Sequence, residues 1–133
     1  LDEILVRKLK DIYNKLTTLS DELICLIDHL DKKADPDISV YITGMKKCRL
    51  AFKKSLEVLE HSNEFYKKDL EINQDRTLDT IRHDMINPVS GLKGYSELIL
   101  EKSCDQYVLT NTEKIISIID NILSLIYLIK TTD

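Results

Sequence analysis

The segment Leu9–Leu30, LKDIYNKLTTLSDELICLIDHL, decides the fold of this chain. Its apolar residues recur at alternating steps of three and four positions, and they are Leu9, Ile12, Leu16, Leu19, Leu23, Leu26 and Leu30. This spacing puts them on one face of an α-helix, in the a and d positions of a heptad repeat. The sequence therefore predicts a long amphipathic helix that packs in a coiled coil or in a bundle of helices.

A second helix is predicted after a short turn. Residues 32–35 interrupt the apolar pattern, and Asp35-Pro36 offers an N-cap followed by a proline at the first helical position, where its missing N–H costs nothing. The next apolar series consists of Ile38, Ile42, Met45, Phe52, Leu56 and Leu59, with Cys48 or Arg49 at its weakest point. Because the turn is short, we expect these two helices to be antiparallel neighbours.

A third helical segment contains a proline. Residues 61–77 are mostly polar but contain neither Gly nor Pro, so we expect helix to continue through them. The apolar series then resumes with Leu78, Ile81, Met85, Leu92, Tyr95 and Ile99. Pro88 lies within this series, where it should bend the helix and leave the carbonyl group of Asp84 without its usual hydrogen-bond donor.

The last helix has the broadest apolar face. Residues 102–106 have the pattern of a hairpin tip, and the helix begins either near Asp105 or at a capping box formed by Thr110 and Glu113. Its apolar series is Ile115, Ile119, Ile122, Ile126 and Ile129, widened by Ile116, Ile118, Leu123 and Leu125. A two-helix hairpin alone is too small to cover so broad a face. We therefore expect either a second chain or the N-terminal hairpin to cover it.

The composition agrees with an all-α fold and argues against several functions. A chain of 133 residues with 43% hydrophobic residues can form a core, and three Gly and two Pro are too few for the many turns of a sheet. The net charge of -4 is spread over both halves, so neither a nucleic-acid nor a membrane contact is predicted. Cys25, Cys48 and Cys104 are widely spaced and lack nearby metal ligands, so we expect reduced thiols and no metal site.

The sequence also bears on location. It has no apolar run of about eighteen residues and no signal peptide, so we expect a cytoplasmic segment. The first residue is Leu rather than Met, which suggests a piece of a longer protein. If the parent protein is anchored in a membrane, we expect its spans to lie outside this segment.

The residues Ile81–Gly91, IRHDMINPVSG, carry the most distinctive chemistry. His83 lies about 200° around the helix from its apolar neighbours, so the imidazole should face outward. One nitrogen of a neutral imidazole can attack phosphorus while the other keeps its proton. The adjacent Asp84 can fix that tautomer, and Asn87 lies one turn further on the same face. The pattern predicts a phosphorylation site, whereas His29 and His61 should be ordinary surface residues.

This segment resembles the H-box of two-component sensor histidine kinases. The family pattern is His, an acidic residue, two variable residues, Asn or Thr, then Pro, and these places are held by His83, Asp84, Asn87 and Pro88. The resemblance continues through the Gly-Tyr-x-Glu-Leu run of residues 94–98 and through residues 119–123, which are similar to the family's second dimerisation helix.

Two residues depart from the family pattern. Val89 stands where the family usually has Leu, which is a mild apolar change. Arg82 stands where many members have a small Ser or Ala, which weakens any assignment to a subfamily.

The resemblance implies two regions and a homodimer. Residues 72–133 correspond to a HisKA-like dimerisation and phosphoacceptor hairpin, and residues 1–71 form an N-terminal helical hairpin or signalling coiled coil without a family signature. Such hairpins dimerise into four-helix bundles. The N-terminal hairpin would then build a second bundle on the same axis, joined by one helix from about Pro36 to about Ser103. The alternative is a single bundle made from both hairpins of one chain.

The resemblance also implies a phosphotransfer reaction. His83 would be autophosphorylated from ATP by a catalytic domain, with Asp84 and Asn87 assisting, and would pass the phosphoryl group to an Asp of a response regulator receiver. Pro88 would be structural. Gly91 and Gly94 are poor helix formers, and we expect them to lie on the exposed face, where they allow close approach by another protein. Ser90, Gly94 and Glu97 are predicted to contact the receiver.

The expected cofactors lie outside this chain. It contains no ATP box and no nucleotide lid, so ATP and Mg²⁺ are expected on a catalytic domain after Asp133 and on the partner receiver. We expect the parent to be a protein histidine kinase, a transferase of signal transduction. Two alternatives remain open: a phosphotransferase without its own kinase in a phosphorelay, and a purely structural dimerisation module.

Overall fold

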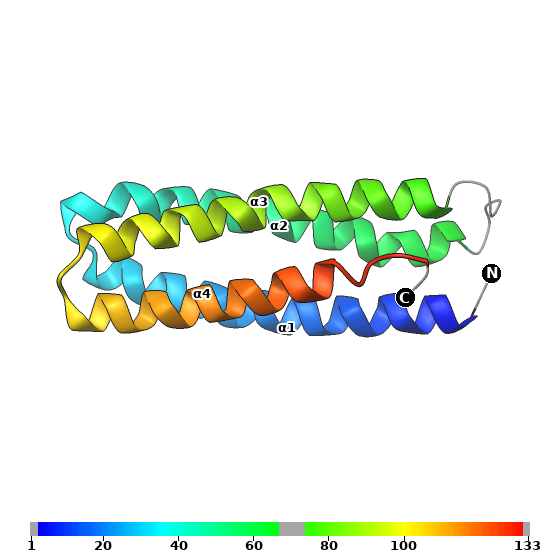
Figure 1. The fold of residues 1–133 in the computed structure, drawn as a ribbon, viewed down its shortest axis with the longest axis horizontal. Coiled ribbons are helices and arrows are strands. Elements are labelled where there is room, and N and C mark those ends of the chain that lie inside the picture. The colour runs from blue at the N-terminus through cyan, green and yellow to red at the C-terminus, as the bar shows by residue number, and fades with distance from the viewer. Residues whose placement is uncertain (1–2, 67–73, 132–133) are drawn as a thin grey trace.

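The computed structural model of this protein describes residues 3–66 and 74–131. It contains four α-helices and, within these residues, no β-strand, so the prediction of an all-α fold is confirmed. The helices are α1 (Glu3–Lys33), α2 (Pro36–Tyr66), α3 (Gln74–Lys102) and α4 (Gln106–Ile126) (Figure 1). None of the described helices is long and apolar enough to cross a membrane.

The four helices lie side by side and alternate in direction (Figure 1). Each packs mainly against two others: α2 lies against α1 and α3, and α4 lies against α3 and α1. Their inward-facing apolar side chains form one core to which all four helices contribute. The broad apolar face of α4 is therefore covered by α1 and α3 of the same chain, and the N-terminal hairpin provides the cover that the sequence required.

The predicted continuous helix from about Pro36 to about Ser103 is wrong. α2 ends at Tyr66, α3 begins at Gln74, and the two helices lie antiparallel against each other (Figure 1). Both helices carry an apolar face, and folding back buries these faces in the shared core, whereas a straight rod would leave them exposed. Residues 67–73, and with them the predicted boundary at residues 71 and 72, lie outside the described residues.

Aspartates cap two helices at the same end of the molecule (Figure 1). Asp35 Oδ1 accepts hydrogen bonds from two backbone N–H groups in the first turn of α2, at 2.9 and 3.2 Å, as predicted. Asp105 Oδ1 accepts one from the N–H of Val108 at 3.1 Å and caps α4. The predicted start near Asp105 is confirmed. The alternative capping box is wrong, because Thr110 lies inside α4.

The buried face of α1 follows the 3.6-residue period of a straight helix more closely than a strict heptad. Ser20 and Ile27 are buried, whereas Leu19 and Leu26, which the heptad placed on the seam, are half-buried and line grooves beside α4. A strict 3.5-residue period requires the helices to supercoil. The remaining predicted positions, Leu9, Ile12, Leu16, Leu23 and Leu30, are all buried.

Candidate functional site

His83 lies on the outer face of α3, as its spacing predicted. Ile81 and Met85, two residues before and after it, are buried in the shared core. The His83 side chain is 73% exposed and that of Asp84 is 65% exposed. A second molecule can therefore reach the imidazole without any rearrangement of the helices.

The imidazole makes its described contacts through one nitrogen. His83 Nδ1 lies 3.5 Å from Asn87 Nδ2 and 4.0 Å from Asp84 Oδ1. When Nδ1 carries the proton, its possible acceptors are the Asp84 carboxylate or, with the amide turned over, the Asn87 oxygen. In that tautomer Nε2 keeps its lone pair. Nε2 is the nucleophilic nitrogen in that tautomer, whereas the Asn87 amide as it stands, with Nδ2 towards Nδ1, suits the tautomer that carries the proton on Nε2.

Pro88 lies inside α3, and its effect on the backbone is compensated by α2. A proline has no N–H to donate to the carbonyl group of Asp84. The hydroxyl of Ser55 on α2 lies 3.3 Å from this carbonyl oxygen and also 3.3 Å from that of Ala51, so its single hydrogen serves two acceptors. The sequence identified the freed carbonyl but not its donor, which stands 29 residues earlier in the chain.

Two glycines allow α2 and α3 to approach closely. A Cβ atom on Gly91 would lie 2.8 Å from Cys48 Sγ, and one on Gly44 would overlap the ring of Tyr95. The prediction that Gly91 lies on the exposed face is therefore wrong, because this residue contacts α2. Gly94 has open space around it, with no atom within 4 Å of an added Cβ, so its predicted exposure is confirmed.

The residues predicted to contact a receiver share the outer face with His83. Ser90, Gly94 and Glu97 are all exposed on α3. On the side of α3 that faces α4, next to these three residues, Lys93 Nζ donates to Asp120 Oδ1 at 2.9 Å. This hydrogen bond and the charge of Asp120 raise the pKa of Lys93. The ion pair joins α3 to α4 along this edge.

Arg82, which departs from the expected small residue, anchors the chain that follows α4. Its Nη1 donates to the backbone oxygen of Ile129 at 2.6 Å, and its Nη2 pairs with Asp79. The guanidinium is thus held next to His83 but on the α4 side of α3. The sequence did not reveal this role, since Ile129 is 47 residues away.

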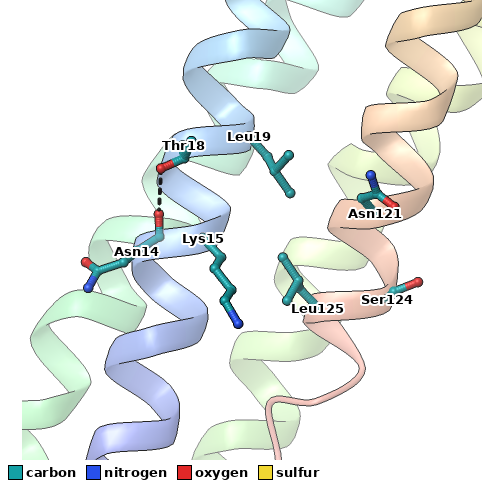
Figure 2. A pocket seen from close by; sticks show the side chains of 7 residues that line it. All are labelled: Asn14, Lys15, Thr18, Leu19, Asn121, Ser124 and Leu125. Atoms are coloured by element: carbon teal, nitrogen blue, oxygen red, sulfur yellow. Dashed lines mark hydrogen bonds between the residues drawn. The ribbon is translucent and has the colours of Figure 1, made fainter.

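A groove lies between α1 and α4, away from His83 (Figure 2). It is lined by Asn14, Lys15, Thr18, Leu19, Asn121, Ser124 and Leu125. The Thr18 hydroxyl donates to the backbone oxygen of Asn14 at 3.1 Å, and the ammonium group of Lys15 pairs with Asp11 at 2.9 Å. The amides, hydroxyls and leucines of this lining do not provide acid–base chemistry, and the amine of Lys15 is paired with Asp11.

A second groove lies between α2 and α3. Its lining is Lys54, Glu57, Val58, His61, Ser62, Thr77 and Ile81. Ile81 precedes His83 by two residues but lies on the buried side of α3, so the groove is near the level of His83 along the helix and not on its outer face. Within residues 3–66 and 74–131, no group of three or more His, Cys, Asp or Glu side chains is arranged to hold a metal ion.

The fold and the site together define an all-α protein that presents an exposed histidine, flanked by Asp and Asn, on a proline-containing helix. Comparisons of the chain with protein-family models, with curated proteins and with solved structures found no match. The functional argument therefore depends on the residues around His83.

Proposed function

We propose that this chain is the dimerisation and phosphoacceptor region of a sensor histidine kinase, and that His83 is the phosphoacceptor. One observation carries the proposal: the His83 side chain is 73% exposed, and its described contacts with Asp84 and Asn87 both involve Nδ1, so that Nε2 is the nitrogen that reacts when Asp84 holds the proton on Nδ1. The similarity of residues 83–88 to an H-box supplies the reaction class.

Phosphorylation begins with attack by the Nε2 lone pair on the γ-phosphorus of ATP. The bond from this phosphorus to the oxygen that bridges to the β-phosphate breaks, ADP leaves, and an N–P bond forms. The proton stays on Nδ1, where the Asp84 carboxylate stabilises the positive charge of the ring. ATP and its Mg²⁺ are held by a separate catalytic domain, and no cofactor is assigned to this chain.

Transfer to the partner reverses the chemistry at His83. A carboxylate oxygen of an Asp in a response regulator receiver attacks the phosphorus, the N–P bond breaks, and its electron pair returns to Nε2. Mg²⁺ on the receiver offsets the charge of the acceptor carboxylate. Asn87 lies close enough to orient either partner, and Ser90, Gly94 and Glu97 lie on the surface that the receiver would cover. ATP as the phosphate source is consistent with a cytoplasmic location.

Homodimerisation belongs to the same proposal. The apolar faces of α3 and α4 are already covered by α1 and α2, so a homodimer would associate through outer surfaces of the four helices. Sedimentation of the chain over a range of concentrations tests this part separately from the chemistry.

A second candidate is a phosphotransferase that relays phosphate and has no kinase domain of its own. The covering of α3 and α4 by helices of the same chain favours it, because one copy then has a complete core and one phosphoacceptor. Phosphorylated receiver domains, rather than ATP, would be the donors. The purely structural alternative predicts no phosphate on His83 from either donor.

The test uses γ-labelled ATP and the native full-length protein. We expect label that is labile in acid and stable in alkali, lost in His83→Ala and retained in His29→Ala and His61→Ala, whose histidines are also exposed. Absence of label with ATP but transfer from a phosphorylated receiver would favour the relay. Absence of label from both donors would refute phosphotransfer.

The role of Asp84 gives a graded result. Asp84→Asn removes the charge that stabilises the imidazolium ring, and we expect phosphohistidine formation to slow by about 10²-fold. Asp28→Asn, at an exposed aspartate of α1, is the control and should label at the rate of the unaltered protein. Equal rates for both variants would remove Asp84 from the mechanism.

A further inference from the structure

The groove between α2 and α3 contains an exposed apolar side chain near the level of the predicted phosphoacceptor along the bundle. Val58 of α2 is 56% exposed and lines this groove together with Lys54 and Ile81. An exposed valine is a poorer helix former than alanine, and the exposed part of its side chain contributes no hydrophobic free energy to folding. Its position in a concave, partly apolar surface is therefore suited to contact with a partner protein.

The hydrogen bond between α2 and α3 fixes the level of this groove relative to His83. Ser55 Oγ lies 3.3 Å from the backbone oxygen of Asp84. Because α2 and α3 are antiparallel, Lys54, one residue before Ser55, is level with the residue after Asp84, and Val58, three residues after Ser55, is level with Ile81. His83 therefore lies between the heights of Lys54 and Val58 along the bundle, about 3 Å from each at 1.5 Å per residue, and both Lys54 and His83 are exposed.

Phosphoryl transfer requires the partner to cover this area. The acceptor carboxylate must come within about 3.5 Å of the phosphorus on His83. A stable protein interface covers about 800 Å² on each partner, which corresponds to a patch extending on the order of 15 Å from its centre. A partner centred on His83 therefore reaches beyond α3 onto a neighbouring helix, either α2 or α4.

The two sides of α3 differ in what they offer. On the α4 side, the Lys93 ammonium is paired with Asp120, and the Arg82 guanidinium is bonded to Ile129 and Asp79. A partner there would have to desolvate these charged groups. On the α2 side, the groove exposes Val58, and the cation of Lys54 complements an acidic acceptor site, although Glu57 lies in the same groove.

We propose that the receiver domain docks across the groove between α2 and α3, so that Val58 and Lys54 of the N-terminal hairpin form part of its binding surface. This inference depends on the proposed phosphotransfer function. It adds that the N-terminal hairpin contacts the receiver directly, in addition to covering the core of the hairpin that carries His83.

The experiment measures transfer from phosphorylated His83 to a receiver domain in two pairs of matched variants. Val58→Asp is compared with Val40→Asp, since Val40 is 64% exposed on the same helix but near its other end. Lys54→Glu is compared with Lys53→Glu, an adjacent exposed lysine that points to the other side of α2. Each protein is charged to the same level of phosphohistidine with phosphoramidate and then titrated with the receiver that accepts phosphate from the unaltered chain.

The expected result is a rise in KM for the receiver by tenfold or more in Val58→Asp and a smaller rise in Lys54→Glu, with both controls within twofold of the unaltered chain. Far-ultraviolet circular dichroism on heating verifies that each variant is folded. Unchanged KM in folded Val58→Asp and Lys54→Glu would overturn this inference and leave the proposed function standing. Absence of phosphohistidine, or of transfer to any receiver, in the unaltered chain would overturn the proposed function and this inference with it.

An independent measurement uses amide chemical shifts of the labelled chain during titration with the same receiver. Shifts on α2 around Val58 as well as around His83 support docking across the groove. Shifts restricted to α3 and α4 would overturn it, and this result does not depend on how any variant folds.

Discussion

The contact between α2 and α3 is closer and more specific than the contact between α1 and α4, although both pairs belong to the same core. α2 and α3 meet at Gly44 and Gly91 and share a hydrogen bond from Ser55. α1 and α4 leave two grooves, one around Leu19 and Leu125 (Figure 2) and one around Leu26, whereas the groove between α2 and α3 lies beyond their close contacts, around Val58. Small residues let two helices approach, and larger ones on the facing surfaces keep them apart. The helix that carries His83 is thus held firmly on the α2 side.

The largest expected effect comes from enlarging a glycine between α2 and α3. In Gly44→Leu the new side chain overlaps the ring of Tyr95, and we expect the free energy of unfolding to fall by about 2 kcal/mol. Gly94→Leu is the matched control, because an added side chain there meets open space and improves helix propensity by up to about 1 kcal/mol. Urea unfolding measures both, and equal stabilities would contradict the difference between the two positions.

The hydrogen bond from Ser55 gives the next effect. Ser55→Ala leaves the carbonyl group of Asp84 without its donor from α2, and we expect a loss of about 1 kcal/mol. In Ser124→Ala the lost hydroxyl bonds only to the backbone of its own helix, at Asp120, so stability should change by less than about 0.5 kcal/mol. A loss of the same size in both variants would show that the hydrogen bond between helices adds nothing.

Filling the groove between α1 and α4 should have a smaller and opposite effect. Asn121→Leu places apolar carbon beside Leu19 and Leu125, and we expect stability to rise by about 0.5 kcal/mol. The same substitution at an exposed position outside the groove, Asn87→Leu, provides the control. A rise in both variants would attribute the gain to helix propensity rather than to the groove.

The smallest expected effect is a dependence on alkaline pH. Burial between α2 and α3 raises the pKa of the Cys48 thiol above its ordinary value of 9.0. The unfolded chain therefore ionises first, so the contribution of this thiol is fully present below pH 9 and is lost as the pH rises through the folded pKa. Cys48→Ala should remove this part of the decline in stability.

Cys25, exposed in the groove between α1 and α4, should be alkylated by iodoacetamide faster than Cys48.

Much of the local structure follows from short stretches of sequence. Asp35-Pro36 sets the start of α2, and the spacing around His83 sets its exposure, because both depend on residues within one or two helical turns. The strict heptad expected for α1 is less accurate. It places Leu19 in the core, whereas the structure buries the next residue, the small Ser20, and leaves Leu19 half-buried.

The arrangement of the helices does not follow from these patterns. An apolar stripe has the same period whether it packs against its own chain or against a second copy, so the sequence left both options open. The polar stretch before α3 contains no residue that forbids a helix, which led to the prediction of one continuous rod. Ser55 and Cys48 were missed at the site for a related reason: each contacts a residue of α3 that is distant in sequence and is brought near only by the fold.

Helices of the same chain cover α3 and α4, and this decides how formation of the core responds to protein concentration. A tethered hairpin is present at an effective concentration on the order of millimolar, however dilute the protein is. Formation of the core around the helix that carries His83 is then unimolecular, and dilution acts only on an association of two chains through their outer surfaces. The exposed imidazole is accordingly presented in the same way whether many copies of the protein are made or few.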